Sequence, residues 1–352
     1  MVSRKKAYSI VYLYSEIMPY QTVVYKELSV LGNTINVFYN DKFKQTPYMP
    51  EEIQNVSYYP SSNYTKEDLY REVINMNPDV LVVCGWSSKK YLYVARKIRR
   101  KFNIPIVCPI DTQFTRRIKQ LIGFIISPVY IKSAFTHIWV PGVRQYHFAK
   151  RLGYENNRII FNSLSGDVNK FMTASIEHKK TNYPKNLLFV GRYNEVKGLR
   201  ILIDVWKSIE DKHGWKIICA GNGPMKDLLE STSDVEVLEF QPQDNLVKIA
   251  ENCGAFILPS TYEPWALVIH EFAASGLPIL ASKACGASDH FVIDNYNGYS
   301  FASGSYVELR NAIEKFINLT ESQKYGMALA SRELSQSVTP RLSAMSLLSI
   351  IQ

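Results

Sequence analysis

Short apolar runs alternate with amphipathic stretches along the whole chain. The amphipathic stretches repeat their apolar positions every three or four residues, as helices do, for example at 90–99. The apolar runs have the length of buried strands, and they lie at 7–14, 34–39, 79–84, 104–109, 137–141, 186–191, 215–220, 235–239, 254–259 and 278–281. Such alternation is typical of parallel sheets covered by helices on both faces. The sequence therefore predicts an α/β protein with two Rossmann-like, doubly wound parallel-sheet domains that face each other across a cleft.

The chain is long enough for two such domains, because it has 352 residues. A polar stretch at 171–186, rich in Lys, Thr and His, separates the two sets of strands. We therefore expect an N-terminal domain at 1–172 and a C-terminal domain at 183–335. A final helix at 336–352 can pack back on the N-terminal domain.

Positive charge is concentrated in the first half of the chain. Residues 1–172 hold 24 Lys and Arg against 12 Asp and Glu, whereas the remainder holds 17 against 20. A basic domain favours an anionic substrate, a membrane surface or a nucleic acid. Because the chain contains no recognised nucleic-acid-binding motif, we expect no nucleic-acid partner.

The segment 116–132 combines this basic character with an apolar run. The run is about half of the roughly 20 residues that span a bilayer, Pro128 interrupts it, and basic residues flank it. One interpretation is a helix that lies in the interface of an anionic membrane, beside a lipid-linked substrate. The other is a buried core helix with a basic rim.

The five cysteines are scattered, and Cys84, Cys108 and Cys219 end apolar runs, where a free thiol packs as a small hydrophobe. An odd count without paired spacing indicates a reducing compartment rather than a disulfide framework or a zinc site. The six histidines are dispersed, so we expect no metal site. No signal-peptide pattern precedes the first strand, and the expected location is cytoplasmic.

The most informative candidate for a binding site is the segment Glu263-Pro-Trp-Ala-Leu-Val-Ile-His-Glu271. Its two carboxylates lie eight positions apart, across the start of a helix predicted at 265–275. The first amides of a helix have no intrahelical partner and suit a phosphate. One acid can then hold hydroxyls of a sugar on one side of the phosphates, and the other can hold hydroxyls of a ribose. This layout suits a nucleotide sugar, although an isolated pair of this spacing is more often a helix cap and a solvated helix residue.

Two cations lie upstream, at the end of another apolar run. Arg192 follows Gly191 directly, and Lys197 precedes Gly198 and a helical pattern. In open α/β sheets, ligands bind at the carboxyl ends of the strands, where Arg offers a bidentate fork to a phosphate and Lys a point charge. The alternative is that both are ordinary loop cations.

Together these segments resemble the retaining glycosyltransferases of family four, which have the GT-B fold. The resemblance covers residues 184–301 strongly and the N-terminal half weakly. The matching pieces come in the family's order and at its spacing: Phe189-Val-Gly-Arg…Lys197-Gly198, Ala220-Gly-Asn-Gly-Pro224, Pro242…Leu246, Leu258-Pro-Ser-Thr-Tyr-Glu-Pro-Trp265, Val268-Ile-His-Glu271, Ala274-Ser-Gly-Leu-Pro278 and Asn297-Gly298.

The resemblance implies that the C-terminal domain binds the nucleotide-sugar donor and the N-terminal domain the acceptor. Arg192 and Lys197 would bind the donor diphosphate in place of a metal, Glu263 would contact the sugar, and Glu271 the ribose. The donor-binding set that the resemblance implies also includes Gly191, Gly221, Trp265 and the amides of Ala266, Leu267 and Val268.

Three positions depart from the family pattern. The family usually has Gly where Ala266 stands, so that a methyl group narrows the sugar pocket. A Gly-Gly-x-Pro-Glu pattern is common where this chain reads Cys285-Gly-Ala-Ser-Asp289, and the Gly expected beside the nucleobase is Glu239. The last two departures leave the base open between UDP- and GDP-linked donors.

Candidates on the acceptor side follow strands of the first half. Many relatives place a His after the fourth strand, where this chain has Asp111 and Gln113, and Asp111 could orient the acceptor or cap a helix. Glu16, after the first strand, and Trp86, after the third of the runs above, are further candidates. For Trp86, a position in an exposed turn without a role in acceptor binding is an equal alternative.

The sequence thus predicts a retaining, metal-independent glycosyltransferase that moves a hexose-type sugar to a glycan acceptor, one that is polyprenyl-linked or otherwise lipid-linked. The expected setting is bacterial surface polysaccharide synthesis (capsule, O-antigen of lipopolysaccharide, or exopolysaccharide), at the inner face of the plasma membrane. Two alternatives stay open: a GT-B nucleotide-sugar epimerase, and a non-catalytic GT-B partner subunit.

Overall fold

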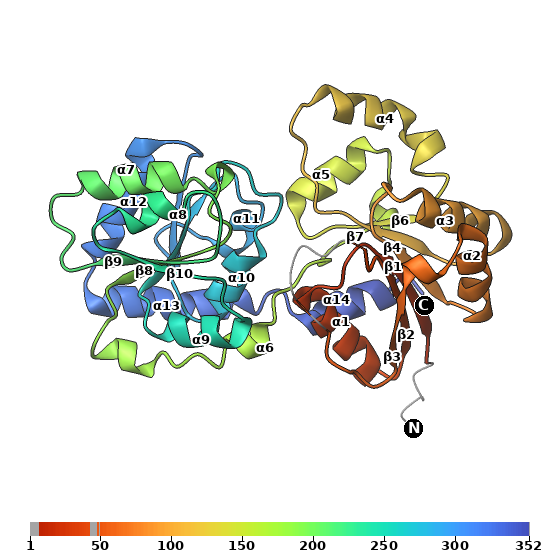
Figure 1. The fold of residues 1–352 in the computed structure, drawn as a ribbon, viewed down its shortest axis with the longest axis horizontal. Helices are drawn as coiled ribbons and strands as arrows, with labels where there is room; N and C mark the ends of the chain where they lie inside the picture. The colour runs from red at the N-terminus through yellow and green to blue at the C-terminus, as the bar shows by residue number, and fades with distance from the viewer. Residues whose placement is uncertain (1–6, 43–47, 49, 352) are drawn as a thin grey trace. The chain divides into compact units, whose positions relative to one another are not determined.

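A computed structural model describes residues 7–42, 48 and 50–351. These residues form two compact units (Figure 1). Unit 1 contains the described residues up to Ser165 together with those from Pro340 onward, and unit 2 is Gly166–Thr339. The sequence places the corresponding boundaries at 172, 183 and 336.

Unit 1 is built on a seven-stranded parallel sheet with the strand order β3-β2-β1-β4-β5-β6-β7. Its strands are β1 (Ser9–Tyr14), β2 (Thr34–Tyr39), β3 (Val56–Pro60), β4 (Val80–Val83), β5 (Ile106–Pro109), β6 (His137–Trp139) and β7 (Ile159–Ile160). Its α-helices are α1 (Pro19–Val30), α2 (Lys66–Asn75), α3 (Lys89–Lys101), α4 (Ile118–Tyr130), α5 (Val143–Arg151) and α14 (Pro340–Leu348).

Alternate residues of the strands supply two cores, one on each face of the sheet, because successive side chains of a strand point to opposite faces. In β1, Val11 and Leu13 pack with α2, α3 and α5, whereas Ile10 and Tyr12 pack with α1 and α14. Burial on both faces explains why these strands are continuous apolar runs in the sequence. Figure 1 shows α2 and α3 on one side of the sheet and α1 with α14 on the other.

The last helix of the chain therefore belongs to the first unit. In α14, Ala344 and Leu347 are fully buried in the core beneath α1. Arg341 lies 3.6 Å from the carboxylate of Glu27, and Ser346 accepts a hydrogen bond of 3.3 Å from Asn162.

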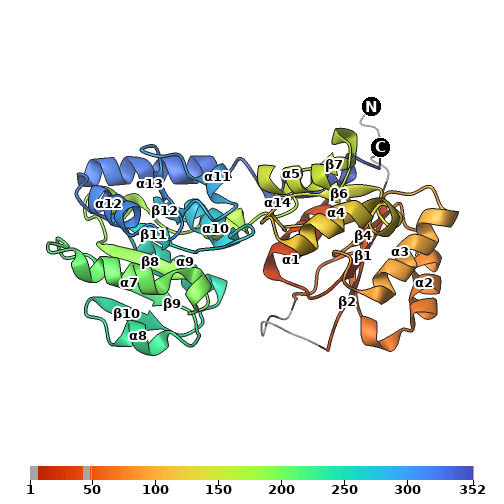
Figure 2. The same cartoon turned by 90° about the horizontal axis from the view of Figure 1, so that it is seen from above.

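Unit 2 has a six-stranded parallel sheet with the order β10-β9-β8-β11-β12-β13. Its strands are β8 (Asn186–Val190), β9 (Lys216–Ala220), β10 (Val235–Leu238), β11 (Ala255–Leu258), β12 (Ile279–Ser282) and β13 (Gly298–Phe301). Its α-helices are α6 (Val168–Phe171), α7 (Leu199–Ser208), α8 (Lys226–Glu230), α9 (Gln243–Glu251), α10 (Leu267–Ala274), α11 (Ser288–Phe291), α12 (Tyr306–Ile317) and α13 (Glu321–Ser335). Figures 1 and 2 show α7 and α12 over one face of this sheet and α9, α10 and α13 over the other.

The predicted fold class, two doubly wound parallel sheets, is confirmed. The sequence missed β3, β7 and β13, and all three are edge strands. An edge strand pairs on one side alone and needs no continuous apolar run; β3 is half-exposed at four of its five positions.

Helix α4 decides between the two interpretations of segment 116–132. The side chains of Ile125 and Val129 are 80% and 81% exposed, so the interpretation as a buried core helix is wrong. Among the described residues, no helix combines the length and the apolar character that crossing a bilayer requires.

Candidate active site

The strand order of unit 2 reverses between β8 and β11. From β8 the chain moves outward to β9 and β10, and it then returns to β11 on the other side of β8. Ligands of open α/β sheets bind at such a switch point, outside the carboxyl ends of the strands. The loops after β8 and β11 carry the two cations and the first of the two carboxylates that the sequence singles out, and the second carboxylate, Glu271, lies in α10.

These two loops lock together through backbone contacts. Gly198 has a left-handed backbone (φ 71°), and a Cβ atom there would lie 2.0 Å from the carbonyl oxygen of Pro259. The amide of Thr261 donates a 2.8 Å hydrogen bond to the carbonyl of Val196. Glycine at 198 is therefore a packing requirement, which holds the β8 loop against the β11 loop.

Lys197 and Glu263 meet across this junction. The Lys197 ammonium group and a Glu263 carboxylate oxygen form an ion pair, and the side chains are only 14% and 19% exposed. Arg192, five residues earlier in the same loop, is exposed to solvent. The loops thus hold one cation against an acid and leave a second cation available to an anion.

Helix α10 starts directly after the Glu263 loop. Its N-cap is Ala266, which adopts a left-handed backbone (φ 78°, ψ 67°) that is strained for any residue with a Cβ atom. This conformation ends the loop abruptly, so the helix begins at Leu267 rather than at the predicted 265. Leu267 and Val268 are half-buried, and their amides belong to the first turn, whose N–H groups lack intrahelical acceptors.

A segment from 285 to 287 supports this loop from behind. The amide of Gly286 donates to the carbonyl of Glu263 at 3.1 Å, and the amide of Ala287 donates to the carbonyl of Trp265 at 2.6 Å. A Cβ atom at Gly286 would lie 2.3 Å from the carbonyl oxygen of Pro264. The sequence identified this segment as a departure from the family pattern, but not as the support of the acidic loop.

The side chain of Trp265 lies in the interior of unit 2. It is 4% exposed, and its ring lies 6.4 Å from that of His290 and 6.3 Å from that of Phe291. These contacts give the indole ring a packing role beneath the loop.

Gly221, at the end of β9, also has a packing role, whereas a Cβ atom at Gly191 would lie no closer than 3.4 Å to another side chain or backbone atom. A Cβ atom at Gly221 (φ 152°) would lie 2.0 Å from the carbonyl oxygen of Gly191. The two strand ends can therefore approach closely only because Gly stands at 221.

Glu271 lies one helical turn into α10 and is 8% exposed. Its carboxylate accepts a 3.1 Å hydrogen bond from the side-chain amide of Gln243, and Gly166 packs so closely that a Cβ atom there would lie 2.9 Å from Cγ of Glu271. Burial raises the pKa of Glu271 to about 7; the Gln243 bond lowers it, and Asp167 adds a smaller increase. The sequence did not identify Gln243 or Gly166 as its neighbours.

The adjacent His270 is a structural residue. Its Nδ1 accepts a 3.1 Å hydrogen bond from the Gly166 amide, and its Nε2 donates at 2.8 Å to the carbonyl of Ser335. The ring stacks on Phe291 with 4.1 Å between centroids. Burial lowers the pKa of His270 to about 4, so the ring is neutral at physiological pH.

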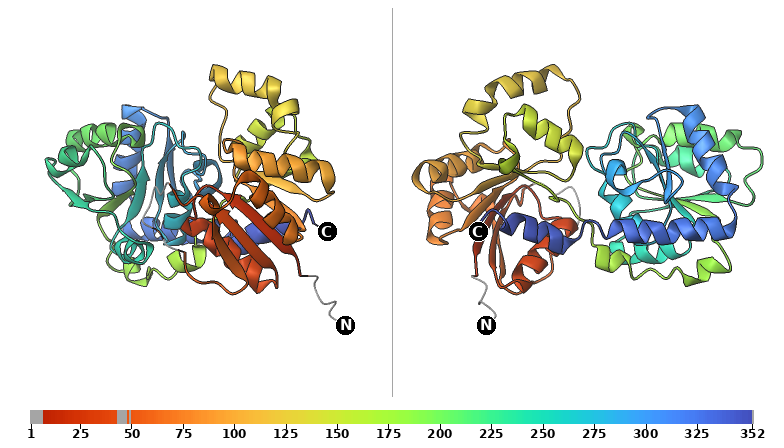
Figure 3. Two further views of the ribbon diagram at one scale, coloured as in Figure 1. Left: turned by 45° about the vertical axis from the view of Figure 1, so that its right-hand side comes forward. Right: turned by 180° about the vertical axis from the view of Figure 1, so that it is seen from behind.

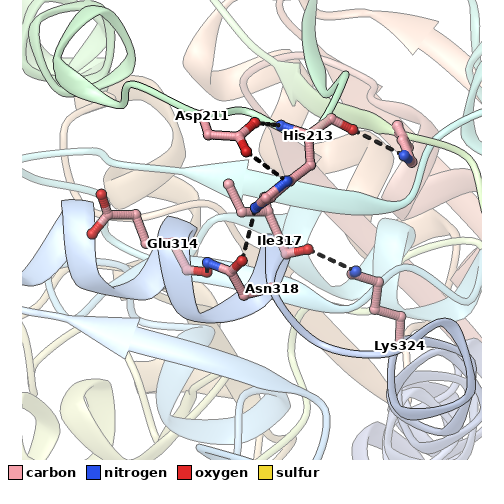
Figure 4. Close-up of polar contacts among 7 residues, drawn as sticks. Asp211, His213, Glu314, Ile317, Asn318 and Lys324 are labelled. Atoms are coloured by element: carbon pink, nitrogen blue, oxygen red, sulfur yellow. Dashed lines mark hydrogen bonds and ion pairs between the residues drawn. The ribbon is translucent and has the colours of Figure 1, made fainter.

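A further polar cluster of unit 2 lies outside the proposed site. Figure 4 shows His213, whose Nε2 lies 2.9 Å from Oδ1 of Asn318 and whose Nδ1 lies 3.1 Å from the carboxylate of Asp211. Nearby, Lys324 donates a 2.8 Å bond to the carbonyl of Ile317. Within the described part of the chain, no group of three His, Cys, Asp or Glu side chains is placed to hold a metal ion.

The candidates in unit 1 follow neighbouring strands. Glu16 follows β1, Trp86 follows β4, and Asp111 and Gln113 follow β5, so all four lie at the carboxyl edge of one sheet around its own switch point between β1 and β4. Asp111 is exposed, and its carbonyl accepts a 2.9 Å bond from Gln145.

Gln113 and Trp86 differ from Asp111 in their surroundings. Gln113 is 8% exposed, and its side-chain oxygen accepts a 3.3 Å bond from Arg144, whereas Trp86 packs partly buried on the core. The sequence missed Tyr20, whose pKa is raised by burial, then by the Asp111 charge and, more weakly, by Glu16.

Comparison with known proteins adds a family match over part of the chain. The sequence model described as "Glycosyl transferases group 1" matches residues 172–327. An uncharacterized glycosyltransferase of Methanocaldococcus jannaschii, MJ1607, is 30% identical over 143 residues, which is 37% of this chain and 37% of that protein. The chain thus matches little more than a third of that relative's length.

A longer match is to the N,N'-diacetylbacillosaminyl-diphospho-undecaprenol alpha-1,3-N-acetylgalactosaminyltransferase of Campylobacter jejuni, with 25% identity over 60% of this chain and 58% of that protein. Among solved structures, Anabaena Alr3699/HepE in complex with UDP and glucose superposes with a TM-score of 0.70 and 15% identity, covering 97% of this chain and 98% of that one. Residues 172–327 therefore match the model of the glycosyl transferases group 1 family, and the chain has the GT-B fold.

Proposed function

We propose that the protein is a retaining glycosyltransferase that transfers a hexose-type sugar from a UDP- or GDP-linked donor to a glycan acceptor. The observation that carries the proposal is the Lys197–Glu263 ion pair beside the start of α10, at the switch point of unit 2. It joins a cation, a carboxylate and free helix amides at one edge, which is the set of groups that a sugar diphosphate requires.

In the proposed donor complex, the diphosphate lies against Arg192, Lys197 and the amides of Leu267 and Val268. These groups stabilise the negative charge that develops on the leaving diphosphate, so the reaction needs no metal ion. Glu263 accepts hydrogen bonds from hydroxyl groups of the sugar.

Glu271 has a separate role in this complex, at the ribose. Its carboxylate accepts hydrogen bonds from ribose hydroxyls, which replace the single bond from Gln243 in the described structure. New hydrogen bonds to the charged form lower a raised carboxyl pKa, so donor binding favours loss of its proton.

The proposed transfer breaks the bond between C1 of the sugar and the phosphate oxygen, and it forms a bond from C1 to an acceptor hydroxyl oxygen. The acceptor attacks the face that the diphosphate leaves, which retains the configuration. A phosphate oxygen of the leaving group takes the proton of the hydroxyl. Asp111 and Glu16 orient the acceptor from the carboxyl edge of the unit 1 sheet.

We further propose a lipid-linked acceptor and a role in bacterial surface polysaccharide assembly, at the cytoplasmic face of the membrane. The C. jejuni relative, which is named as an N-acetylgalactosaminyltransferase for a diphospho-undecaprenol, supports the lipid-linked acceptor. The UDP and glucose of the HepE complex support UDP over GDP and a hexose donor.

Donor binding is the first test. Thermal unfolding of the purified protein is followed with UDP, GDP, ADP and their common sugars, with EDTA present throughout. A ligand that binds only the folded state raises its stability by RT ln(1 + [L]/Kd). We expect one nucleotide family to raise the melting temperature without metal, and the Lys197→Ala and Arg192→Ala variants to lose that increase.

The matched control is Arg200→Ala. Arg200 is an exposed cation close to the same loop, and its guanidinium group lies 2.8 Å from the carboxylate of Glu195. This variant should keep the increase. Transfer is then measured with the selected donor and lipid-linked glycans. Conversion of a UDP sugar without acceptor would indicate an epimerase, and binding without transfer or hydrolysis a non-catalytic subunit.

A further inference from the structure

Helix α4 presents an apolar face to solvent. Six aliphatic side chains spaced three or four residues apart are between 47% and 81% exposed, and they are Ile118, Leu121, Ile122, Ile125, Ile126 and Val129. Residues at this spacing share one side of a helix. The patch is therefore a continuous aliphatic strip and not a set of scattered side chains.

The opposite side of α4 fixes the helix to unit 1. The ring of Phe124 lies 5.6 Å from that of Phe114 and 5.2 Å from that of Phe148. Buried Ser127 donates a 2.8 Å bond to the carbonyl of Leu152. These contacts hold α4 in one orientation and leave its aliphatic strip exposed to solvent. Figure 3 shows the backbone of this helix, in yellow, at the periphery of unit 1.

A basic groove lies between α2 and α3. It has a volume of about 560 Å³, and its lining includes six cations, Lys66, Lys89, Lys90, Arg96, Lys97 and Arg100. No acidic side chain lines it among the residues that the structure describes. The ammonium group of Lys97 lies 4.7 Å from the ring of Tyr70 and 4.8 Å from that of Tyr93, so aromatic faces rather than carboxylates hold this charge.

Arg96 joins the groove to the end of α4. It lines the groove, and its guanidinium group also donates a 2.9 Å hydrogen bond to the carbonyl of Tyr130, the last residue of α4, and lies 4.8 Å from the Tyr130 ring. Arg96 thus connects the lining of the groove to the C-terminal end of α4. Further exposed cations lie at both ends of the strip: Arg116, Arg117, Lys119 and Lys132. The groove, the strip and these cations together are the candidate docking surface.

We propose that this surface docks the protein on an anionic lipid bilayer. Ile and Val side chains carry no polar group, so they suit the acyl boundary of a membrane, and the cations suit the phosphates of the headgroups. A nucleic acid would satisfy the cations and gain nothing from the aliphatic strip. A second copy of this chain would set two basic rims against each other, so charge complementarity selects the anionic bilayer.

The proposal does not depend on the donor site, because every residue that carries it lies in unit 1 and outside the switch points. It is tested by co-sedimentation of the full chain with phosphatidylcholine vesicles, with or without 30% phosphatidylglycerol, at low and high salt. We expect binding to the anionic vesicles that falls at least tenfold in high salt and at least tenfold without phosphatidylglycerol.

Two pairs of substitutions separate the contributions. Ile125→Ser with Val129→Ser, at positions 80% and 81% exposed, should weaken binding to anionic vesicles at least tenfold, and so should Lys89→Ala with Arg100→Ala in the groove. The matched controls are Val30→Ser with Val307→Ser, which are 71% and 65% exposed elsewhere, and they should bind as the wild type does.

Each remaining outcome overturns the proposal. Wild-type protein that ignores anionic vesicles at low salt excludes a lipid surface, and wild-type binding by the strip variant shows that α4 is not the contact. Light scattering distinguishes a second copy: a dimer that the strip variant dissociates would show that α4 is a protein interface. Donor-induced thermal stabilisation, measured on the same variants, should be unchanged, so failure here leaves the proposed function standing.

Discussion

The carboxyl group of Glu271 should cost the folded protein stability at neutral and alkaline pH. It is 8% exposed, and burial raises its pKa from 4.5 to about 7. Between these two values the folded state keeps a proton that the unfolded state has lost. Stability therefore falls as the pH rises through this window, and above pH 7 the loss is complete.

The magnitude follows from the width of the window. Each unit of pKa difference corresponds to about 1.36 kcal/mol, so the interval from 4.5 to about 7 amounts to about 3 kcal/mol. Glu271→Gln removes the charge and keeps an oxygen that can accept the hydrogen bond from Gln243. We expect this variant to be more stable than the wild type by up to about 3 kcal/mol at pH 8 and equally stable at pH 4.

Urea unfolding at pH 4, 5, 6, 7 and 8 measures this difference. The chain has two compact units, so the transition that belongs to unit 2 is the one to compare. Glu210→Gln, at an exposed position, is the matched control and should leave the pH dependence unchanged. If the free energies of unfolding of the wild type and of Glu271→Gln differ by the same amount at every pH, the reasoning from burial is wrong.

The same substitution separates stability from function. In the proposed donor complex the Glu271 carboxylate accepts hydrogen bonds from the ribose. Glu271→Gln should therefore weaken nucleotide binding, although it stabilises the folded protein in the absence of ligand. A substitution that raises the free energy of unfolding but lowers the affinity for nucleotide is expected only at a residue whose role is to bind the ligand. A glutamine variant that binds nucleotide as tightly as the wild type would remove Glu271 from the donor site.

Three further predictions concern the loops at the switch point. Gly198→Ala should destabilise unit 2 by at least about 2 kcal/mol more than Gly304→Ala, because both positions have a left-handed backbone but only position 198 would place its Cβ atom against a carbonyl; equal losses in urea unfolding would contradict the close approach. A double-mutant cycle of Lys197→Met and Glu263→Gln should give a coupling free energy of about 1–2 kcal/mol, which lies between the values of exposed and of buried ion pairs. A coupling free energy near zero would mean that the ion pair is absent in solution. Ala266→Gly should raise stability by about 0.5–1 kcal/mol, since it removes left-handed strain that exceeds the entropic cost of glycine, and any loss of stability would argue against that backbone.

The sequence predicts the interior strands because burial on both faces demands continuous apolar runs. The same reasoning fails at three of the four edge strands, β3, β7 and β13: β7 is two residues long, and β13 opens with Gly298 at the margin of its sheet. The fourth edge strand, β10, is predicted correctly at 235–239. The N-terminus of α10 shifted by two residues for a local reason, since the left-handed Ala266 delays the helix and propensity gives no sign of it.

The site could be predicted as a set of residues but not as a set of contacts. Lys197 and Glu263 are 66 positions apart, and only the parallel register of β8 beside β11 brings their loops together. Gln243 beside Glu271 and the Cys285–Ala287 segment behind Glu263 have no local signature at all. Tertiary proximity of this kind is set by topology, which the pattern of single segments does not encode.

The proposed site also gathers features that a protein selected only for stability would avoid. Ala266 holds a strained backbone, Glu271 is a buried carboxyl with a raised pKa, and Lys197 with Glu263 forms a largely desolvated ion pair. Each of these costs free energy in the absence of a ligand, and all three lie on the loops and the helix at one sheet edge. Their concentration at a topological switch point is a physical argument for a ligand there that does not use the family resemblance, and the opposite signs expected of Glu271→Gln put that argument to the test.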